Sequence, residues 1–298
     1  MLSRSVFVRC LLGWQTFTLG GLLFTFQSAF AAPSATPSSV QEARQAPASV
    51  QGQPTEAPAA APSTSAMPNP AMIVLEPTVK ALDLAWTVRH ELHDKILEFL
   101  RKKTTLPDNY EVLWRMARLS YYSGFFGMPK NATSEDKMIV FQVGTEAGER
   151  ARRLEAKRVE GHYWYAVTLG GWGIAKGVLN ALSSAGPMRD ALGEAIKIDA
   201  KYHFAGPLRV RGRLYYKLPG IISFGDNQKA AEDLKNAIAL APDIKLNHIY
   251  MAEVQSKIQT KADALKTLDY AKTLPDIVGV AEEASYRRDI AELESKYR

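Results

Sequence analysis

The chain has 298 residues, of which 46% are hydrophobic and 23% charged, as is ordinary for a globular protein. Its 37 basic and 31 acidic residues give a formal net charge of +6, without the basic run that tracks a phosphate backbone. The composition therefore gives no support to nucleic-acid binding. The single cysteine, Cys10, lies near the start, so the rest of the chain has no disulfide, thiolate metal site or cysteine nucleophile.

Residues 1–31 have the three parts of a secretory signal peptide. Arg4 and Arg9 form a basic start, an apolar stretch follows, and the small residues Ala29 and Ala31 fit a cleavage site. We therefore expect an exported protein of the periplasm or cell envelope. Because the apolar stretch is about twenty residues long, the alternative is an uncleaved leader that tethers the protein to the membrane.

Residues 32–74 form a predicted linker that is rich in Pro, Ala and Ser. Such a segment has too few apolar side chains to offset the entropy of ordering, and its prolines favour extended polyproline II. Fully extended, it reaches on the order of 100 Å. The folded domain is expected to cover residues 75–298.

Residues 75–298 show helical periodicity and no convincing alternating strand. The first helix is predicted to open at Pro77, a favourable first-turn residue, and to end after Arg101, whose charge suits the negative helix end. A last helix is expected from about Val280. These are the additional N- and C-terminal helices of an all-α fold.

Between these helices the sequence repeats itself in the manner of tetratricopeptide helical hairpins, with small residues where two helices touch. About four degenerate units are recognisable. Their small and apolar residues are Trp114, Met116, Ala117, Gly148, Ala151 and Leu154; Ala166, Leu192, Ala195 and Ile198; Gly212, Tyr215, Ala230, Leu234, Ala237 and Leu240; and Met251, Ala252, Ala264, Leu268, Ala271 and Leu274.

The first three units are longer than the last. Paired small residues lie 19 positions apart in the last unit (Ala252 to Ala271) but 34 apart in the first (Ala117 to Ala151). The extra residues predict glycine-rich inserts with large apolar side chains at 124–129, 169–173 and 218–226, all on one edge of the repeat array.

Clustered aromatic residues are unusual in plain loops, so this edge is the predicted ligand-binding surface. Its candidate residues are Phe125, Phe126, Trp172, Ile221, Ile222 and Phe224. In the alternative interpretation the inserts fold back and plug the repeat core.

Two arginines are further ligand-binding candidates. Arg209 and Arg213 share a helix face at i, i+4 and could meet a carboxylate of an organic-acid ligand or of a partner protein. The alternative is an ordinary solvated helix face.

Several strings resemble a known family, the T-component of tripartite ATP-independent periplasmic (TRAP) transporters, the TatT-like proteins. They are residues 160–166, 202–207, 218–220, 223–226 and 246–248. The resemblance implies an all-helical exported protein that forms a homo-oligomer, binds the transporter's periplasmic substrate-binding protein and holds a small hydrophobic ligand. Related repeat domains also occur in eukaryotic regulators of microtubule dynamics, so the fold alone does not establish transport.

The sequence thus predicts an accessory protein of TRAP-type transport that binds a small hydrophobic or organic-acid ligand. The alternative is a generic tetratricopeptide scaffold that mediates protein–protein interaction in the cell envelope. We find no signature of a hydrolase, phosphate loop or dinucleotide site, so no enzyme activity, cofactor or metal is expected.

Overall fold

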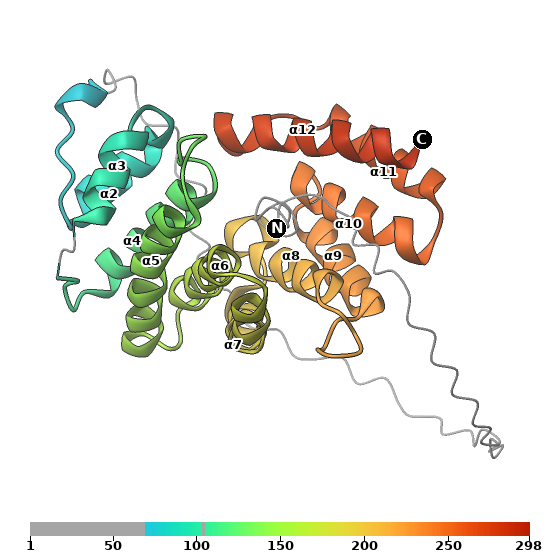
Figure 1. Ribbon diagram of the computed structural model, residues 1–298, viewed down its shortest axis with the longest axis horizontal. Helices are drawn as coiled ribbons and strands as arrows, with labels where there is room; N and C mark the ends of the chain where they lie inside the picture. Colours follow the sequence, from blue (N-terminus) through green and yellow to red (C-terminus); the bar gives the residue numbers. More distant parts are fainter. Residues whose placement is uncertain (1–68, 103–104) are drawn as a thin grey trace, which may run out of the picture. The chain divides into compact units, whose positions relative to one another are not determined.

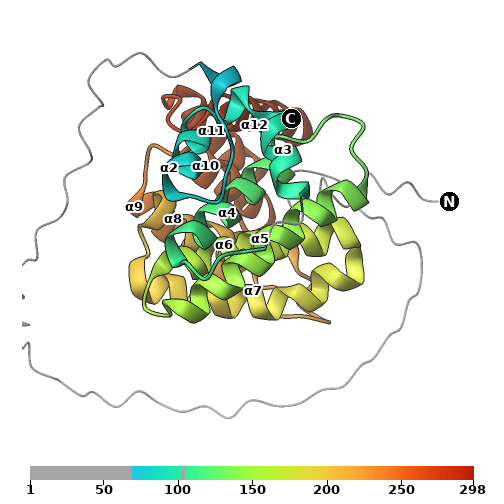
Figure 2. The same cartoon turned by 90° about the vertical axis from the view of Figure 1, so that its left-hand side faces the viewer.

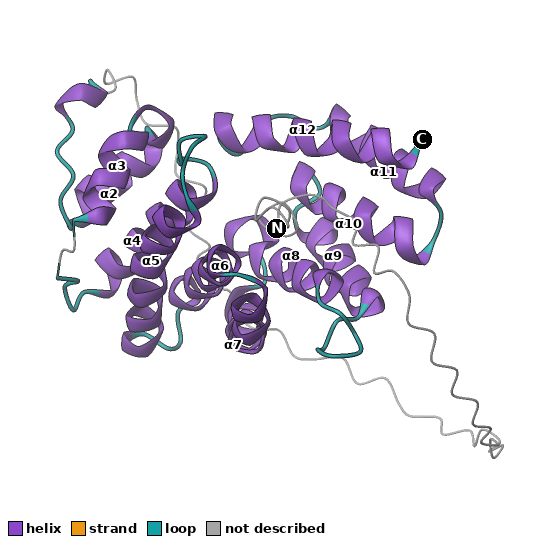
Figure 3. Ribbon diagram, viewed as in Figure 1, coloured by secondary structure: helices purple, strands orange, loops and turns teal. Residues whose placement is uncertain are grey.

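The computed structural model of the protein describes residues 69–102 and 105–298. In these ranges all regular elements are helical, with eleven α-helices and two short 3-10 helices (Figure 3). The predicted all-α fold of tetratricopeptide-like hairpins is confirmed. The predicted signal peptide and residues 32–68 of the predicted linker lie outside the described residues.

The described chain begins with short helices. They are η1 (Pro70–Met72), α2 (Val79–Thr87), η2 (Arg89–Glu91) and α3 (His93–Arg101). We expected one helix from Pro77 to about Arg101, and that prediction was wrong. The Thr78 side chain caps α2 by accepting from the Ala81 N–H at 3.3 Å. The helix then breaks because Val88 and Leu92 leave helical geometry while their side chains stay buried.

Four antiparallel hairpins follow, one for each predicted repeat unit (Figure 1). They pair α4 (Tyr110–Phe125) with α5 (Ser134–Leu154), α6 (Val159–Lys176) with α7 (Val178–Asp199), α8 (Tyr202–Lys217) with α9 (Asn227–Leu240), and α10 (Lys245–Ile258) with α11 (Lys261–Thr273). The last helix, α12 (Val280–Tyr297), begins where the sequence predicted it.

The hairpins stack in two layers. The first helices of the units, α4, α6, α8 and α10, contact one another in that order, and α12 packs on α10 as the next member of this first-helix layer. The second helices, α5, α7, α9 and α11, each pack on the first helix of their own unit. Figure 2 shows one of them, α7, below its partner α6 in that view. The first helices α4, α6, α8 and α10 therefore supply most of the walls of a cavity.

Glycine lets the helix backbones come close in the first two units. A β-carbon on Gly148 of α5 would lie 2.7 Å from the Tyr165 backbone of α6. One on Gly161 would lie 2.6 Å from the Arg152 backbone. These distances are shorter than van der Waals contact, so the close α5–α6 pairing requires glycine at both positions.

One of the three predicted inserts is not a loop, because residues 169–173 lie inside α6. They lengthen that helix at a place of tight glycine contact: a β-carbon on Gly171 would lie 2.4 Å from the Phe141 ring. The insert at 124–129 is a loop in part, since Gly124 and Phe125 end α4 and residues 126–129 lie in the connection to α5. Residues 218–226 lie wholly in the connection between α8 and α9.

The described domain has two main hydrophobic cores. The first uses buried residues between 73 and 195, from the start of the described chain to α7, and includes Trp164. The second uses residues between 230 and 297, from α9 to α12, and includes Leu268. Helix α8 lies between them and packs through small clusters around Leu208 and Leu214. The two cores are therefore joined through α8.

The close α5–α6 pairing generates a prediction. We expect Gly148→Ala to lower the free energy of unfolding by about 1–3 kcal/mol, because its methyl group would overlap the Tyr165 backbone. Gly193→Ala in α7 is the matched control, since nothing lies within 4 Å of its β-carbon. We expect that change to stabilise by roughly 0.5–1 kcal/mol. Urea unfolding checks both, and equal effects of the two changes would contradict the packing argument.

Candidate functional site

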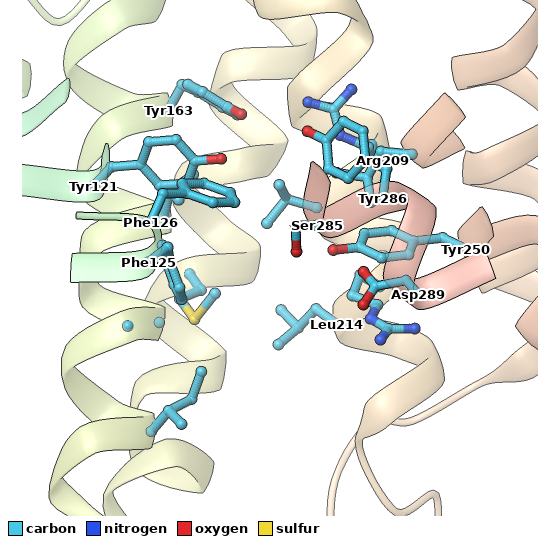
Figure 4. Close-up of a pocket in the computed structure, with 18 residues that line it drawn as sticks. Tyr121, Phe125, Phe126, Tyr163, Arg209, Leu214, Tyr250, Ser285, Tyr286 and Asp289 are labelled. Atoms are coloured by element: carbon cyan, nitrogen blue, oxygen red, sulfur yellow. The ribbon is translucent and has the colours of Figure 1, made fainter. Parts of the chain in front are cut away.

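A cavity lies between the first-helix layer and α12 (Figure 4). The centre of a water molecule can reach about 90 Å³ of it. This is room for several waters or for one bulky apolar side chain. Its walls come from α4, α6, α7, α8, α10 and α12, so both hydrophobic cores contribute to it.

The walls are mainly aromatic and aliphatic. On one side Tyr121, Phe125 and Phe126 form a ring cluster at the end of α4, with centroids 5.4 to 6.4 Å apart. On the other side lie Tyr250, Tyr286 and Leu214, as Figure 4 shows. Burial raises the pKa of Tyr121 and Tyr250, so both hydroxyls stay protonated at neutral pH.

Arg213 lies in the wall but is used within the chain. Its guanidinium pairs with the Glu253 carboxylate of α10 and lies 4.1 Å from the Tyr250 ring centroid. Lys217 Nζ also reaches Glu253, at 3.1 Å. The carboxylate that the sequence led us to expect at this arginine is therefore an internal one.

Arg209 supports the backbone at the start of α8. It donates from Nη1 to the Phe204 carbonyl at 2.8 Å and to Asn247 Oδ1 at 3.1 Å, and from Nη2 to the His203 carbonyl at 3.4 Å. Its side chain is buried. Like Arg213, it has a structural role that the sequence did not indicate.

The backbone held by Arg209 is left-handed. His203, Phe204 and Ala205 have φ values of 48°, 59° and 58°. Each costs about 1–2 kcal/mol in an L-residue, so the three together store roughly 3–6 kcal/mol. The Tyr163 hydroxyl hydrogen-bonds His203 Nδ1 at 3.1 Å. Burial and the Arg209 charge lower the pKa of His203 to about 3, which keeps the imidazole neutral.

Asp289 of α12 is the carboxylate of the cavity lining. Burial raises its pKa to about 7, and the opposing effect of the Arg213 charge is smaller. Over residues 69–102 and 105–298 we find no hydrogen bond or ion pair of this carboxylate. Asp289 therefore titrates near neutral pH inside the cavity.

The structure divides the eight residues that the sequence singled out. Phe125, Phe126, Arg209 and Arg213 line the cavity. The other four lie elsewhere. Phe224 packs on Leu214 and Met188, and Trp172 lies in α6 with Lys176 Nζ 4.3 Å from its ring centroid. Ile221 and Ile222 are 99% and 73% exposed. A ligand-binding role for any of the eight stays a prediction.

The sequence reading missed Tyr121, Tyr163, Tyr250, Tyr286 and Asp289. A signal was present for some of them, since Tyr121 precedes Phe125 by four residues and shares its helix face. Asp289 carried no signal, because only the return of α12 onto the first-helix layer brings it to the cavity.

Two further properties concern the described helices alone. None of them combines the length and apolar character needed to cross a membrane. In the same part of the chain, no three His, Cys, Asp or Glu residues are grouped so that they could hold a metal ion.

Comparison with known proteins adds two sequence matches. Residues 79–221 match the family model described as regulator of microtubule dynamics protein 1-3. The human regulator of microtubule dynamics protein 2 is 25% identical over 201 residues, which cover 63% of this chain and 48% of the human protein. The chain thus spans about half the length of this curated relative.

Two solved structures are also similar. TTC0263, a thermophilic TPR protein of Thermus thermophilus, has a TM-score of 0.47 and 16% identity, and the match covers 73% of this chain and 92% of that chain. Yeast Tom70 has a TM-score of 0.29 and 11% identity over 73% of this chain and 61% of its own.

The two sequence matches correct the family resemblance. The strings at 160–166 and 202–207, which resembled the TRAP T-component, lie inside the range that matches the microtubule-regulator model. Both strings contain buried packing residues, such as Tyr163, Trp164 and Ala205, so their similarity to another family reflects helix packing and not a shared function. The prediction of a TatT-like accessory protein of TRAP transport was therefore wrong. The partners expected with it were wrong as well: the periplasmic substrate-binding protein, the homo-oligomer and the small ligand. Export remains a prediction from residues 1–31.

The left-handed turn predicts an unusual order of stabilities. At Phe204, which is 42% exposed, we expect glycine to be more stable than alanine by about 1–2 kcal/mol, because only glycine adopts positive φ without strain. At exposed Lys235, inside α9, we expect the reverse order by roughly 1 kcal/mol. Chemical unfolding of the four variants checks this, and the same order at both positions would contradict the left-handed assignment.

The carboxyl of Asp289 predicts a pH effect. Its folded-state pKa of about 7 lies above the ordinary value of 3.8, so the folded protein binds the extra proton between these two values. The stabilisation of the folded state by this extra proton is fully present below pH 3.8 and is lost as the pH rises through 7. We expect the free energy of unfolding to fall by about 1–2 kcal/mol between pH 5 and 8. This is less than the full pKa shift implies, because the group is half-buried.

Asp289→Asn should remove this pH-dependent difference, whereas Glu232→Gln, a change at an exposed position of α9, should keep it. The free energy of unfolding at pH 5 and pH 8 provides the measurement. An unchanged difference in Asp289→Asn would show that another group is responsible.

Proposed function

We propose that this chain is a protein-binding module whose cavity receives an apolar side chain of a partner protein. The observation that carries the proposal is the aromatic cavity between the first-helix layer and α12. Burying a Leu or Phe side chain there would contribute about 1.5–3 kcal/mol. An anchor of this kind in a well-packed pocket is typical of an interface hot spot.

The charges around the cavity support binding of an apolar group. Arg213 is paired with Glu253, and Arg209 is occupied by backbone carbonyls and Asn247. The cavity therefore offers its partner mainly aromatic and aliphatic surface. The neutral, hydrogen-bonded His203 is a poor base at neutral pH, which favours binding over catalysis.

A more specific version of the proposal follows from the match over residues 79–221 to regulators of microtubule dynamics. In this version the partner is a protein of the microtubule system. Because the chain spans about half of the human relative, the functions of the whole relative do not transfer directly.

Ser285→Phe tests the site. Ser285 lies on α12 within the cavity lining (Figure 4), so a phenyl ring there would occupy the space meant for the partner. A randomised twelve-residue phage library selected on the unaltered protein should yield peptides that share a large apolar residue. We expect Ser285→Phe to weaken the binding of these peptides at least about tenfold, which corresponds to a loss of roughly 1.4 kcal/mol of binding free energy.

Arg288→Leu, an exposed change on the same helix, is the matched control and should leave peptide binding unchanged. Fluorescence polarisation measures the affinities. Selected peptides that bind both variants equally would contradict the cavity as the binding site. Co-sedimentation with microtubules assembled from purified tubulin, with and without Ser285→Phe, tests the more specific version.

A further inference from the structure

We propose that the protein is a clamp whose two hydrophobic cores open and close about α8, with an ion pair between Arg89 and Glu282 as its clasp. The proposal concerns the regulation of the cavity described above and in that sense rests on the proposed function. Its structural content, an open and a closed state, is testable without any partner.

The position of the cavity is the first argument. Tyr121 and Phe125, on one wall, pack on the first core, whereas Tyr250 and Tyr286, on the other, belong to the second core. Helix α8 joins the two. A change in the angle between the cores would therefore change the width of the cavity directly.

The clasp connects the far ends of the described chain. Glu282 Oε1 accepts from Arg89 Nη2 at 2.8 Å and from Nε at 3.2 Å, although the residues are 193 positions apart. Figure 1 shows α12 (red) running from the side of α3 and α4 to the C-terminus beside α11. The Arg89 and Glu282 side chains are only 13% and 6% exposed. The clasp thus holds the start of α12 against the first core.

An ion pair of this kind suits a reversible closure. Separating two buried charges into water recovers their hydration, which offsets much of the lost attraction. Removing the charge of one partner in the closed state instead leaves the other charge buried and uncompensated. Opening is therefore the favoured response to the loss of either charge.

Helix α12 moves with the second core in this scheme. Tyr286, Ile290 and Leu293 are buried in that core. Glu283 accepts from Lys245 Nζ of α10 at 3.0 Å and from the Ile277 N–H at 3.0 Å. The start of α12 is thus fixed to α10, so the moving part is the whole second core and not a separate lid.

The left-handed turn at 203–205 is the hinge. Pro207 has no N–H to donate to the His203 carbonyl, and Arg209 donates to it instead. Three consecutive residues are held at positive φ between α7 and the rest of α8. Relaxation of these strained dihedrals on opening would redirect α8, as hinge segments do in domain closure.

Distances between spin labels on the two cores test the clamp in the full-length chain. The native cysteine is removed by Cys10→Ser, and labels are attached through Glu135→Cys of α5 and Ala262→Cys of α11, both exposed. In this background Glu282→Gln should increase the fraction of molecules with the longer, open-state distance between the two labels at least about tenfold. Glu98→Gln, which removes an exposed ion pair with Lys102 at the end of α3, should leave the distances unchanged.

A second variant tests the hinge. Phe204→Gly relieves strain in the closed state, so adding it to Glu282→Gln should shift the distances back toward the closed value. If Glu282→Gln fails to fold, Arg89→Lys replaces it, because lysine keeps the charge but loses the two-point contact. Distances in the clasp variant that equal those of the unaltered chain would overturn the clamp, and so would an absence of any response to Phe204→Gly. These readouts do not involve a partner, so they are independent of the peptide selection.

Discussion

The contact between the Arg209 guanidinium and the carbonyls of His203 and Phe204 governs the geometry of this protein. A left-handed run of three L-residues is unfavourable by itself, and the buried charge supplies strong hydrogen bonds that compensate for it. The turn sets the direction of α8, and α8 joins the two hydrophobic cores. This buried arginine, which also lines the cavity, therefore supports the turn from which α8 continues.

The pairing of charges within the chain explains why the cavity is largely apolar. Arg213 meets Glu253 behind the Tyr250 ring, so the cations of α8 are satisfied before any partner arrives. The remaining lining presents rings, aliphatic groups and the half-buried carboxyl of Asp289. Water held against such a surface is readily displaced by an apolar side chain. This is the physical basis for proposing a binding role for the site.

The family resemblance failed for a reason that the structure makes clear. The strings that carried it contain Tyr163 and Trp164, which are buried, and the turn that begins at Tyr202. Residues of this kind maintain helix packing in any relative with the same fold, whatever it binds. The match over 79–221 to regulators of microtubule dynamics includes both strings and therefore accounts for them.

The sequence by itself determined the helical hairpins, since spaced small residues such as Ala252 and Ala271 report local helix contacts directly. It also identified Phe125 and Arg209 as notable positions. Only the tertiary structure decided that residues 169–173 continue α6, because close packing outweighs the low helix propensity of glycine. It alone brought Asp289 into the cavity and Glu282 to Arg89, because the proximity of residues so far apart depends on how the repeats stack and leaves no periodic trace in the chain.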